Sequence, residues 1–268
     1  MNYKNKVVVV LVTGAGSGIG QAVALHFARL SENLSLVDSN RETLNETAAK
    51  CEQLNVKVHR SVIDVTKDED VKRTIADTVE EFGRLDVVVN CAGVYRPDNI
   101  DSANLLENFD RTLAVNLRAI VSLVHFATPA LVESKGNVVN ISSVAGFLVV
   151  DESLSYSLSK AGVNQLTKSA ALSLAPRGVR VNSVLPGIVH TNILFNNQVM
   201  GKEEQCEFID SIAAQMPLER EVRAGDVAEM VAFLASDRAA CVTGVCVPID
   251  AGFMLGKKLT GFDKLVAN

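Results

Sequence analysis

Apolar runs of strand length alternate with amphipathic stretches along this chain, and the alternation predicts its secondary structure. Lys6–Val12 carries a continuous β-branched run, as in a strand that is buried on both faces. In the following stretch, Gln21–Leu30, the apolar residues Val23, Phe27 and Leu30 recur at helical spacing. The pattern therefore predicts a strand, a short turn and a helix in succession.

The alternation continues without a linker, an internal repeat or a low-complexity segment. Further strands are predicted at residues 34–38, 56–59 (ending at Asp64 and Val65), 85–89, 137–141, 179–184 and 245–249. Further helices are predicted at residues 41–54, 68–82, 104–132, 155–174 and 226–234. This order is typical of an α/β fold, a doubly wound parallel sheet with helices on both faces. We expect one domain over residues 1–268, and the role of the tail at 257–268 stays open.

Composition agrees with this picture and argues against several functions. The chain has 268 residues, of which 48% are hydrophobic and 21% charged, as in globular proteins. The net charge of −5, without a basic block, argues against a nucleic-acid surface. The first apolar run is too short to span a bilayer, so no membrane insertion is expected.

Cysteine and histidine usage bears on location and metal binding. The five cysteines are an odd number at scattered spacings, which favours a reduced, cytoplasmic location over a disulfide framework. The four histidines form no cluster with the spacing of metal ligands. We therefore expect no catalytic metal.

A glycine-rich segment, TGAGSGIG at Thr13–Gly20, joins the first predicted strand to the first helix. Unpaired backbone N–H groups and the positive end of the helix meet there, so that a pyrophosphate can bind. Gly14 permits the turn, Gly18 lets a phosphate approach, and Gly20 lets helix and strand pack closely. The alternative is a tight turn that needs glycines for its geometry alone.

The second predicted strand ends at Asp38, 18 positions after Gly20. An acid at this place can accept both hydroxyls of an adenosine ribose. Because a carboxylate repels a 2′-phosphate, Asp38 favours NAD(H) over NADP(H), although the nearby Arg41 leaves NADP(H) open. The alternative is that Asp38 only caps the helix that begins near Arg41.

Ligands of such sheets bind beyond the carboxyl ends of the strands, where the strand order reverses. We expect Asp64 to accept from an adenine amino group and the backbone of Val65 to contact the ring. Asn90–Gly93 offers small residues where a ring or ribose lies flat against backbone. Further candidates at strand ends are Ser142, Ser143, Pro186 and Gly187. Turn chemistry is the alternative reading for any one of these residues.

The candidate chemistry lies in the stretch YSLSK at 156–160. Tyr156 and Lys160 are four positions apart in a predicted helix and therefore share one face. A free phenol has a pKa of about 10, and a neighbouring ammonium lowers it, so that the hydroxyl works as acid or base near neutral pH. Ser143 ends the preceding strand and can hold a substrate oxygen. Such a Tyr–Lys spacing also occurs by chance on many helices.

Six features in order resemble the successive signatures of the short-chain dehydrogenase/reductase family. They are TGAGSGIG at 13–20, NCAG at 90–93, Asn116, Ser143, YSLSK at 156–160 and PGIVHT at 186–191. The resemblance extends to Asp250-Ala251-Gly252, and Cys91 replaces the commoner asparagine of NNAG. It implies a Rossmann-type sheet of about seven strands in the order 3-2-1-4-5-6-7.

The resemblance also implies a role for each matching residue. Tyr156 would be the general acid or base, Ser143 would orient the substrate oxygen, and Lys160 would bind the nicotinamide ribose and lower the pKa of Tyr156. Asn116 would hold a water that links Lys160 to solvent, unless it only bonds neighbouring backbone. The residues expected to bind the cofactor are Gly14, Ser17, Gly18, Ile19, Gly20, Asp38, Asp64, Val65, Asn90, Ala92, Gly93, Tyr156, Lys160, Pro186, Gly187, Val189 and Thr191.

These features predict an NAD(H)-dependent oxidoreductase that interconverts a secondary alcohol and a ketone, with the direction left open. A predicted substrate lid at residues 191–216 favours an apolar, steroid-, retinoid- or prostanoid-like substrate, unless its side chains only pack onto the core. The apolar candidates are Val94, Tyr95, Phe147–Val150, Ile193, Leu194, Phe195, Val199, Met200, Phe208 and Ile212.

Three alternatives stay open: a 3-oxoacyl-type reductase, a non-catalytic dinucleotide-binding regulatory protein, and a methyltransferase with an adenosyl cofactor. Intact Ser143, Tyr156 and Lys160 argue against the regulatory protein, and a methyltransferase has no use for the Tyr–Lys pair. The apolar faces of residues 104–132 and 155–174, together with the resemblance, imply a homotetramer or homodimer.

Overall fold

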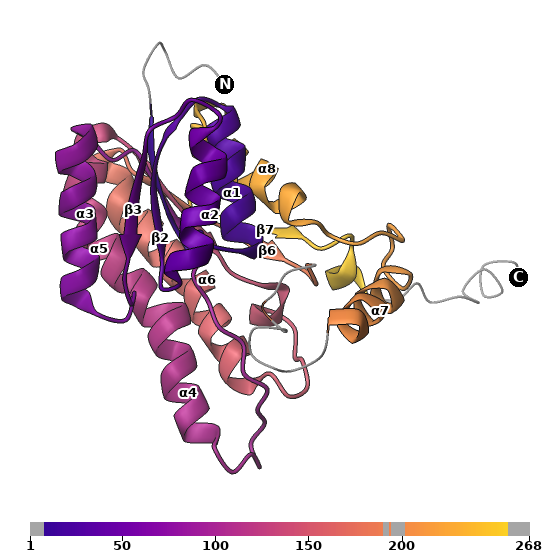
Figure 1. Ribbon diagram of the computed structural model, residues 1–268. Coiled ribbons are helices and arrows are strands. Elements are labelled where there is room, and N and C mark those ends of the chain that lie inside the picture. The colour runs from indigo at the N-terminus through magenta and orange to yellow at the C-terminus, as the bar shows by residue number, and fades with distance from the viewer. Residues whose placement is uncertain (1–7, 190–192, 194–201, 257–268) are drawn as a thin grey trace, which may run out of the picture.

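The computed structural model describes residues 8–189, 193 and 202–256. Parallel strands form a seven-stranded sheet in the order β3-β2-β1-β4-β5-β6-β7 (Figure 1), as predicted. The order reverses between β1 and β4, so the crevice for a ligand is expected at their carboxyl ends. The strands are β1 (Val9–Thr13), β2 (Asn33–Asp38), β3 (Val58–Val62), β4 (Val87–Asn90), β5 (Asn137–Ile141), β6 (Arg180–Pro186) and β7 (Cys246–Ile249).

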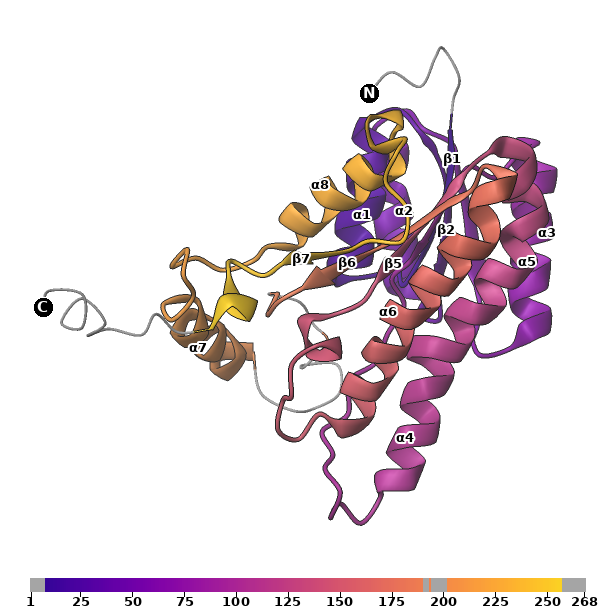
Figure 2. The ribbon, with the colours of Figure 1, turned by 180° about the vertical axis from the view of Figure 1, so that it is seen from behind.

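Helices cover both faces of the sheet (Figures 1 and 2). One face carries α1 (Gly18–Arg29), α2 (Arg41–Glu52) and α8 (Ala224–Ala235). The other carries α3 (Asp68–Phe82), α5 (Ala119–Ser134) and α6 (Leu154–Leu174), and α4 (Leu105–Leu113) continues past the sheet beside α6. The remaining α-helix, α7 (Lys202–Ala213), lies beyond the carboxyl ends of β6 and β7.

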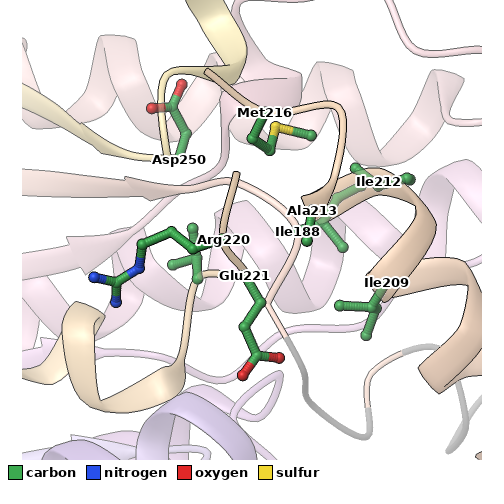
Figure 3. Close-up of a pocket in the computed structure, with 9 residues that line it drawn as sticks. Ile188, Ile209, Ile212, Ala213, Met216, Arg220, Glu221 and Asp250 are labelled. Carbon is green, nitrogen blue, oxygen red and sulfur yellow. The ribbon is translucent and has the colours of Figure 1, made fainter. Parts of the chain in front are cut away.

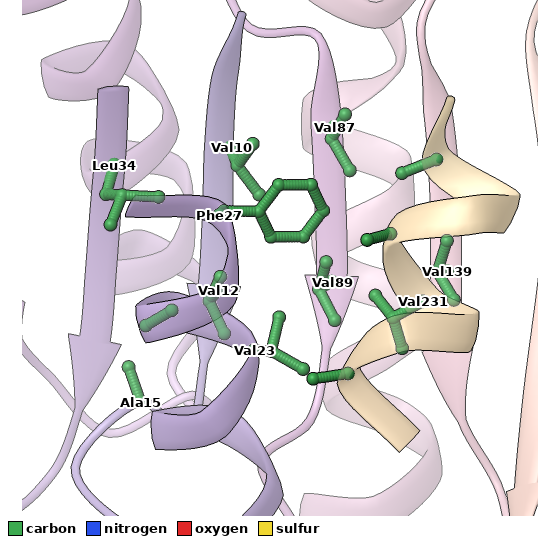
Figure 4. Packing of buried hydrophobic residues seen from close by; sticks show 14 of the residues in the cluster. Val10, Val12, Ala15, Val23, Phe27, Leu34, Val87, Val89, Val139 and Val231 are labelled. Atoms are coloured by element: carbon green, nitrogen blue, oxygen red, sulfur yellow. The ribbon is translucent and has the colours of Figure 1, made fainter. Parts of the chain in front are cut away.

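The central strand β1 is buried on both faces, as its continuous apolar run predicts. Val10 and Val12 pack with Phe27 of α1 and Val231 of α8 (Figure 4). The alternate residues of the strand, including Leu11, face the core under α3, α5 and α6. Two apolar layers therefore hold β1, and with it the turn that follows, in a fixed place.

The predicted helix at 104–132 is interrupted. A π-helical turn, Ala114–Arg118, separates α4 from α5 and contains the fully buried Asn116. Such a turn inserts one residue into the helical ladder and is frequent at functional sites. The helix α7 was not predicted, and α1 begins at Gly18 rather than Gln21, so that the end of the glycine segment, with Ile19 and Gly20, already forms its first turn.

The whole helical segment Leu105–Ser134, with its π-helical turn, is long and apolar enough, by length and composition, to cross a membrane. Of its most apolar stretch, 44% is buried inside the protein, and the core helix of a soluble protein meets the same criterion. Its hydropathy is accounted for in part by its contacts with α3, α6 and β4.

Candidate active site

The glycine segment after β1 forms a close turn against the segment after β4. Gly14 has φ +67°, and a Cβ added there would come within 2.9 Å of the Ala92 backbone. A Cβ on Gly20 would lie 2.0 Å from the Gly14 carbonyl oxygen, so the first turn of α1 packs directly on this turn. Both contacts leave room for hydrogen only. The glycines thus meet the geometric requirement, and Gly20 lies as close to its neighbour as the sequence predicted.

The N-terminus of α1 has the properties of an anion site. The helix begins at Gly18, and the preceding Ser17 is extended and makes no side-chain cap. The first turn holds no acidic side chain, and Gly18 has φ +54°. Because the first N–H groups of a helix have no partner within it, they are free to donate to a phosphate. Ile19 packs its side chain on the core and holds this turn in place.

Asp38, at the end of β2, supports the same turn from the other side. Its carboxylate accepts the Gly16 N–H at 2.8 Å and the Asn40 N–H at 2.9 Å. The cap of α2 is Asn40, whose side chain accepts the Thr43 N–H. Asp38 is therefore not the residue that caps α2. Its partly exposed carboxylate lies beside the glycine turn.

Asp64 and Val65 follow β3 on the same edge. The exposed Asp64 carboxylate accepts both the backbone N–H and the hydroxyl of Thr66, at 2.9 and 2.7 Å. The Thr66 N–H holds the pKa of Asp64 below its usual value. Turn chemistry thus explains the local role of Asp64, and adenine binding stays a prediction. Val65 is buried at 9% exposure.

The segment Asn90–Gly93 is fixed by hydrogen bonds to two neighbouring strands, β1 and β5. The Thr13 hydroxyl accepts the N–H groups of Cys91 and Ala92, both at 3.1 Å. The Asn90 amide donates to the Asn140 amide oxygen at 2.7 Å across the sheet. A Cβ on Gly93 would lie 3.4 Å from Asn116 Oδ1 and 3.8 Å from Lys160 Nζ. The segment therefore adjoins both the glycine turn and the candidate catalytic residues.

Tyr156 lies in the first turns of α6, beside Ser143 at the end of β5. Burial raises the pKa of Tyr156 to about 12, and its hydrogen bond with Ser143 acts in the opposite direction. The structure therefore does not reproduce the lowered pKa that the resemblance implies, because desolvation of the buried phenol outweighs the opposing hydrogen bond with Ser143. Ser143 is buried, and its hydroxyl also accepts the Ala145 N–H at 3.2 Å.

Lys160 reaches from the same helix face back to β5. Its ammonium donates to the Ile141 carbonyl oxygen at 2.9 Å and lies 5.5 Å from the centre of the Tyr156 ring. Burial lowers the pKa of Lys160 to about 8. The predicted common face of Tyr156 and Lys160 is thus present, with the cation over the ring. Ser142 supports this part of α6 through a hydrogen bond to the Lys160 carbonyl oxygen at 3.1 Å.

Asn116 uses its side chain to hold the backbone beyond Gly93. Its amide oxygen accepts the Val94 N–H at 2.8 Å, and its amide nitrogen donates to the Val94 carbonyl at 2.9 Å and to Ser159 Oγ at 3.2 Å. These are the backbone bonds that the sequence left as the alternative. A water-holding role for Asn116 stays a prediction. The π-helical turn around it contacts α6, the helix that carries Tyr156 and Lys160.

The segment after β6 lies at the same carboxyl edge of the sheet as the segments after β1 and β4. The Gly187 N–H donates to the Ile249 carbonyl at 2.9 Å, and a Cβ on Gly187 would lie 3.0 Å from the Asp250 backbone. Val189 is nearly buried and bridges to Val222. Pro186 is the last residue of β6. Outside the described part of the chain lie Thr191, the Phe208 side chain and, in the predicted lid, Leu194, Phe195, Val199 and Met200.

The described part of the predicted lid packs on the sheet edge. A small pocket between α7 and the segments after β6 and β7 is lined mainly by apolar side chains (Figure 3). Ile209 is 2% exposed and Met216 is 9% exposed, so these two side chains are buried around this pocket. Nearer Tyr156, the loop after Ser143 exposes Phe147, Val149 and Val150. The residues that line the pocket beside α7 are Ile188, Ile209, Ile212, Ala213, Met216, Arg220, Glu221, Val222 and Asp250.

Sequence reasoning missed two residues beside Tyr156. The Tyr95 ring meets the Tyr156 ring edge-on, with centroids 5.4 Å apart. The buried Asp98 carboxylate accepts the N–H of Ser155. Tyr95 was expected only as an apolar wall, and Asp98 carried no signal because its contact spans 57 positions. Among the described residues, no group of three or more His, Cys, Asp and Glu side chains forms a metal site.

Comparisons with known proteins agree with this arrangement. Residues 14–254 match a family described as enoyl-(acyl carrier protein) reductase. The chain is 34% identical to the 3-oxoacyl-[acyl-carrier-protein] reductase FabG of Thermotoga maritima, over 92% of this chain and 98% of that protein. It is 36% identical to the 2-(R)-hydroxypropyl-CoM dehydrogenase of Xanthobacter autotrophicus, over 91% of this chain and 98% of that protein.

A solved structure gives the same result. The chain superposes with a TM-score of 0.88 on a short-chain dehydrogenase/reductase of Caenorhabditis elegans solved with its cofactor, at 30% identity, over 96% of this chain and 97% of that one. The family match covers the glycine turn, Ser143, Tyr156 and Lys160. The chain therefore belongs to the short-chain dehydrogenase/reductase family of oxidoreductases, which bind a nicotinamide dinucleotide.

Proposed function

We propose that this chain is an NAD(H)-dependent oxidoreductase that interconverts a secondary alcohol and a ketone. The observation that carries the proposal is the meeting of Tyr156, Ser143 and Lys160 beside the glycine turn at one edge of the sheet. A proton-exchanging hydroxyl, an oxygen-orienting hydroxyl and a buried cation are the groups that alcohol oxidation and ketone reduction require.

The residues at this edge fit a dinucleotide. The cradle at Gly14 and Gly20 has no room for a Cβ, and the N-terminus of α1 offers unpaired donors to a pyrophosphate. Asp38 would accept the ribose hydroxyls and exclude a 2′-phosphate, which favours NAD(H). Lys160 would bind the nicotinamide ribose, and the Val189 backbone and Thr191 would fix the carboxamide. When bound, the nicotinamide supplies or accepts the hydride.

Proton transfer belongs to Tyr156. With a pKa of about 12, the phenol is protonated at neutral pH and is ready to donate to a ketone oxygen. In the reverse direction it must first lose its proton, and a positive charge nearby makes this easier. Ser143 would hold the substrate oxygen next to the Tyr156 hydroxyl. Reduction is therefore favoured toward low pH and oxidation toward high pH.

The proposed substrate has an apolar body. Phe147 is 52% exposed and Val149 102% exposed on the loop that joins Ser143 to α6. Tyr95 adds an aromatic face beside Tyr156. Exposed apolar side chains next to polar catalytic groups suit a secondary alcohol with a hydrophobic body, of the steroid, retinoid or prostanoid kind.

A substrate and cofactor screen tests this proposal. Apolar secondary alcohols and ketones, short polar alcohols and a 3-oxoacyl thioester are each assayed with NAD(H) and NADP(H), by absorbance of the reduced nicotinamide. The proposal expects turnover with NAD(H) and higher kcat/KM for apolar substrates than for sugars or charged acids. Turnover with NADP(H) alone, or a preference for polar substrates, contradicts it.

A 3-oxoacyl reductase is the second candidate. It is favoured by the similarity to a 3-oxoacyl-[acyl-carrier-protein] reductase over nearly the whole chain. In the screen, this candidate expects the 3-oxoacyl thioester to exceed every free ketone in kcat/KM. A non-catalytic regulatory role expects cofactor binding without turnover of any compound.

We further propose one domain, a homotetramer or homodimer, and a cytoplasmic location. The oligomer is supported by exposed apolar side chains on α5 and α6, namely Val121, Leu158 and Leu172. The location is supported by the free thiols of Cys51, Cys91, Cys241 and Cys246. Sedimentation velocity tests the proposed homotetramer or homodimer against a monomer.

A further inference from the structure

The segment that follows β4 is joined to the start of α6 through backbone and side-chain contacts. The Asp98 N–H donates to the Glu152 carbonyl oxygen, and the Leu154 N–H donates to the Asp98 carbonyl oxygen, both at 3.1 Å. These two bonds form an isolated parallel bridge between Asp98 and Ser153. The segment 95–98 and the residues just before Tyr156 are therefore held in one register.

Asp98 also supplies the charge that the start of α6 lacks. Ser153, the N-cap of α6, makes no side-chain cap, and the first turn of the helix contains no acid. The Asp98 carboxylate, in a residue that is 2% exposed, accepts the Ser155 N–H at 2.9 Å and the Ser155 hydroxyl. A carboxylate at a helix N-terminus is stabilised by the free N–H groups and the helix dipole. The residue so held immediately precedes Tyr156.

Tyr95 contacts the Tyr156 ring itself. The two rings meet edge-on at an interplanar angle of 79°, with centroids 5.4 Å apart. The Tyr95 hydroxyl donates to the Glu152 carbonyl oxygen and accepts the Ser153 hydroxyl, both at 3.2 Å. An aromatic ring fixed at its hydroxyl end leaves its neighbour few orientations. The other titratable groups that face Tyr156 are Cys91 and Lys160.

We propose that Tyr95 and Asp98 are positioning residues for Tyr156. Asp98 fixes the backbone from which the tyrosine projects, and Tyr95 fixes the plane of its ring against Ser143. The inference rests on the proposed role of Tyr156 as the proton-exchanging group. A displacement of about 1 Å in such a group costs on the order of 100-fold in rate, so two supports of this kind bear directly on turnover.

The test uses the full chain and four variants. Tyr95→Phe removes the two hydroxyl contacts and keeps the ring, and Tyr95→Leu also removes the ring. Asp98→Asn keeps one acceptor and removes the charge. Asp86→Asn is the matched control. Like Asp98, Asp86 is a buried carboxylate that accepts a backbone N–H, in this case that of Val9 at 3.0 Å. It lies just before β4, at the end of the sheet opposite to Tyr156.

The expected result separates positioning from stability. Tyr95→Phe and Asp98→Asn should each lower kcat about tenfold, with Tyr95→Leu lower still. Their pH profiles of kcat should shift in apparent pKa, while Kd for NADH stays unchanged. Asp86→Asn should lower only the melting temperature. The inference is overturned if Tyr95→Phe and Tyr95→Leu both keep the wild-type kcat and the wild-type pH profile. The Tyr95 variants give this result even if Asp98→Asn does not fold.

Tyr156→Phe, assayed in parallel, keeps the two proposals apart. If Tyr156→Phe retains turnover, the proposed role of Tyr156 is wrong and the positioning inference falls with it. If Tyr156→Phe is inactive while the Tyr95 variants match the wild type, only the positioning inference is wrong.

Discussion

The Lys160 ammonium lies 5.5 Å from the centre of the Tyr156 ring and donates its hydrogen bond to the Ile141 carbonyl oxygen. Burial lowers the pKa of Lys160 to about 8 and raises the pKa of Tyr156 to about 12. The two groups respond in opposite directions because burial disfavours the charged form of each. In this arrangement, both catalytic candidates are nearer to their neutral forms than they are in water.

The lowered pKa of Lys160 makes stability depend on pH. Between pH 8 and about 10.5 the unfolded chain binds more protons at this lysine than the folded chain does, so the free energy of unfolding rises with pH. The stability gained in this way is lost again as pH falls through 8. Denaturant unfolding of the wild type and of Lys160→Met at pH 7.5, 8.5 and 9.5 measures this effect. The free energy of unfolding should rise with pH in the wild type and should not show this rise in the variant. The exposed Lys168 on the same helix gives the control, Lys168→Met, which should run parallel to the wild type.

Gly20 should tolerate no side chain. A Cβ there would lie 2.0 Å from the Gly14 carbonyl oxygen, so Gly20→Ala must push α1 away from the turn. We expect Kd for NADH to rise by about 100-fold or more, with a lower melting temperature, as measured by fluorescence titration and calorimetry. Gly225→Ala is the control: nothing lies within 4 Å of its added Cβ, and its NADH affinity should equal that of the wild type.

Asp38 should decide cofactor preference. Asp38→Asn removes the charge that repels a 2′-phosphate while keeping an oxygen for the Gly16 N–H. We expect the ratio of kcat/KM for NAD to that for NADP to fall at least about tenfold. Asn40→Ala weakens the start of α2 next to Asp38 without a change of charge, and its ratio should stay at the wild-type value. An unchanged ratio in Asp38→Asn means that another residue excludes the phosphate.

Glu32 should make the protein less stable as pH rises through 6. Its carboxylate accepts the Val8 N–H at 2.7 Å, and burial raises its pKa to about 6. The folded chain therefore binds more protons here than the unfolded chain does. This contribution to stability is complete below about pH 4.5 and is lost as pH rises through 6. Glu32→Gln should remove the loss and melt higher than the wild type at pH 7.5 but not at pH 5. Equal pH dependence in thermal scans of both proteins contradicts this.

Much of the fold was predictable because strongly apolar runs report burial on both faces. Strand β5 (Asn137–Ile141) agrees with the apolar run that predicted it, and helix α3 (Asp68–Phe82) agrees with its amphipathic pattern. The sheet order also agrees, but it was implied by the family resemblance rather than by the apolar runs. Helix α7 was missed because its sequence mixes charged and apolar residues and lies in the predicted lid. The π-helical turn at Asn116 was missed because the apolar spacing on either side of it is that of one helix.

In the candidate site, too, features set by local spacing were predicted and features set by distant contacts were missed. Local spacing placed Tyr156 and Lys160 on one face and Gly14, Gly20 and Asp38 around one turn, and family membership excludes the methyltransferase alternative. The contacts of Asp98 and Tyr95 depend on a loop meeting a helix far along the chain, which no local pattern reports. The pKa of Tyr156 depends on how deeply the ring is buried, and the spacing of YSLSK says nothing of this.

The central claim is that the Tyr156 hydroxyl exchanges the proton in an alcohol–ketone reaction. The most direct measurement compares wild type and Tyr156→Phe for turnover and for NADH affinity, on the best substrate from the screen. We predict a loss in kcat of about 100-fold to 10,000-fold with NADH affinity unchanged, because the variant removes one oxygen from a partly buried ring. A Tyr156→Phe protein that binds NADH and turns over at the wild-type rate would contradict the claim.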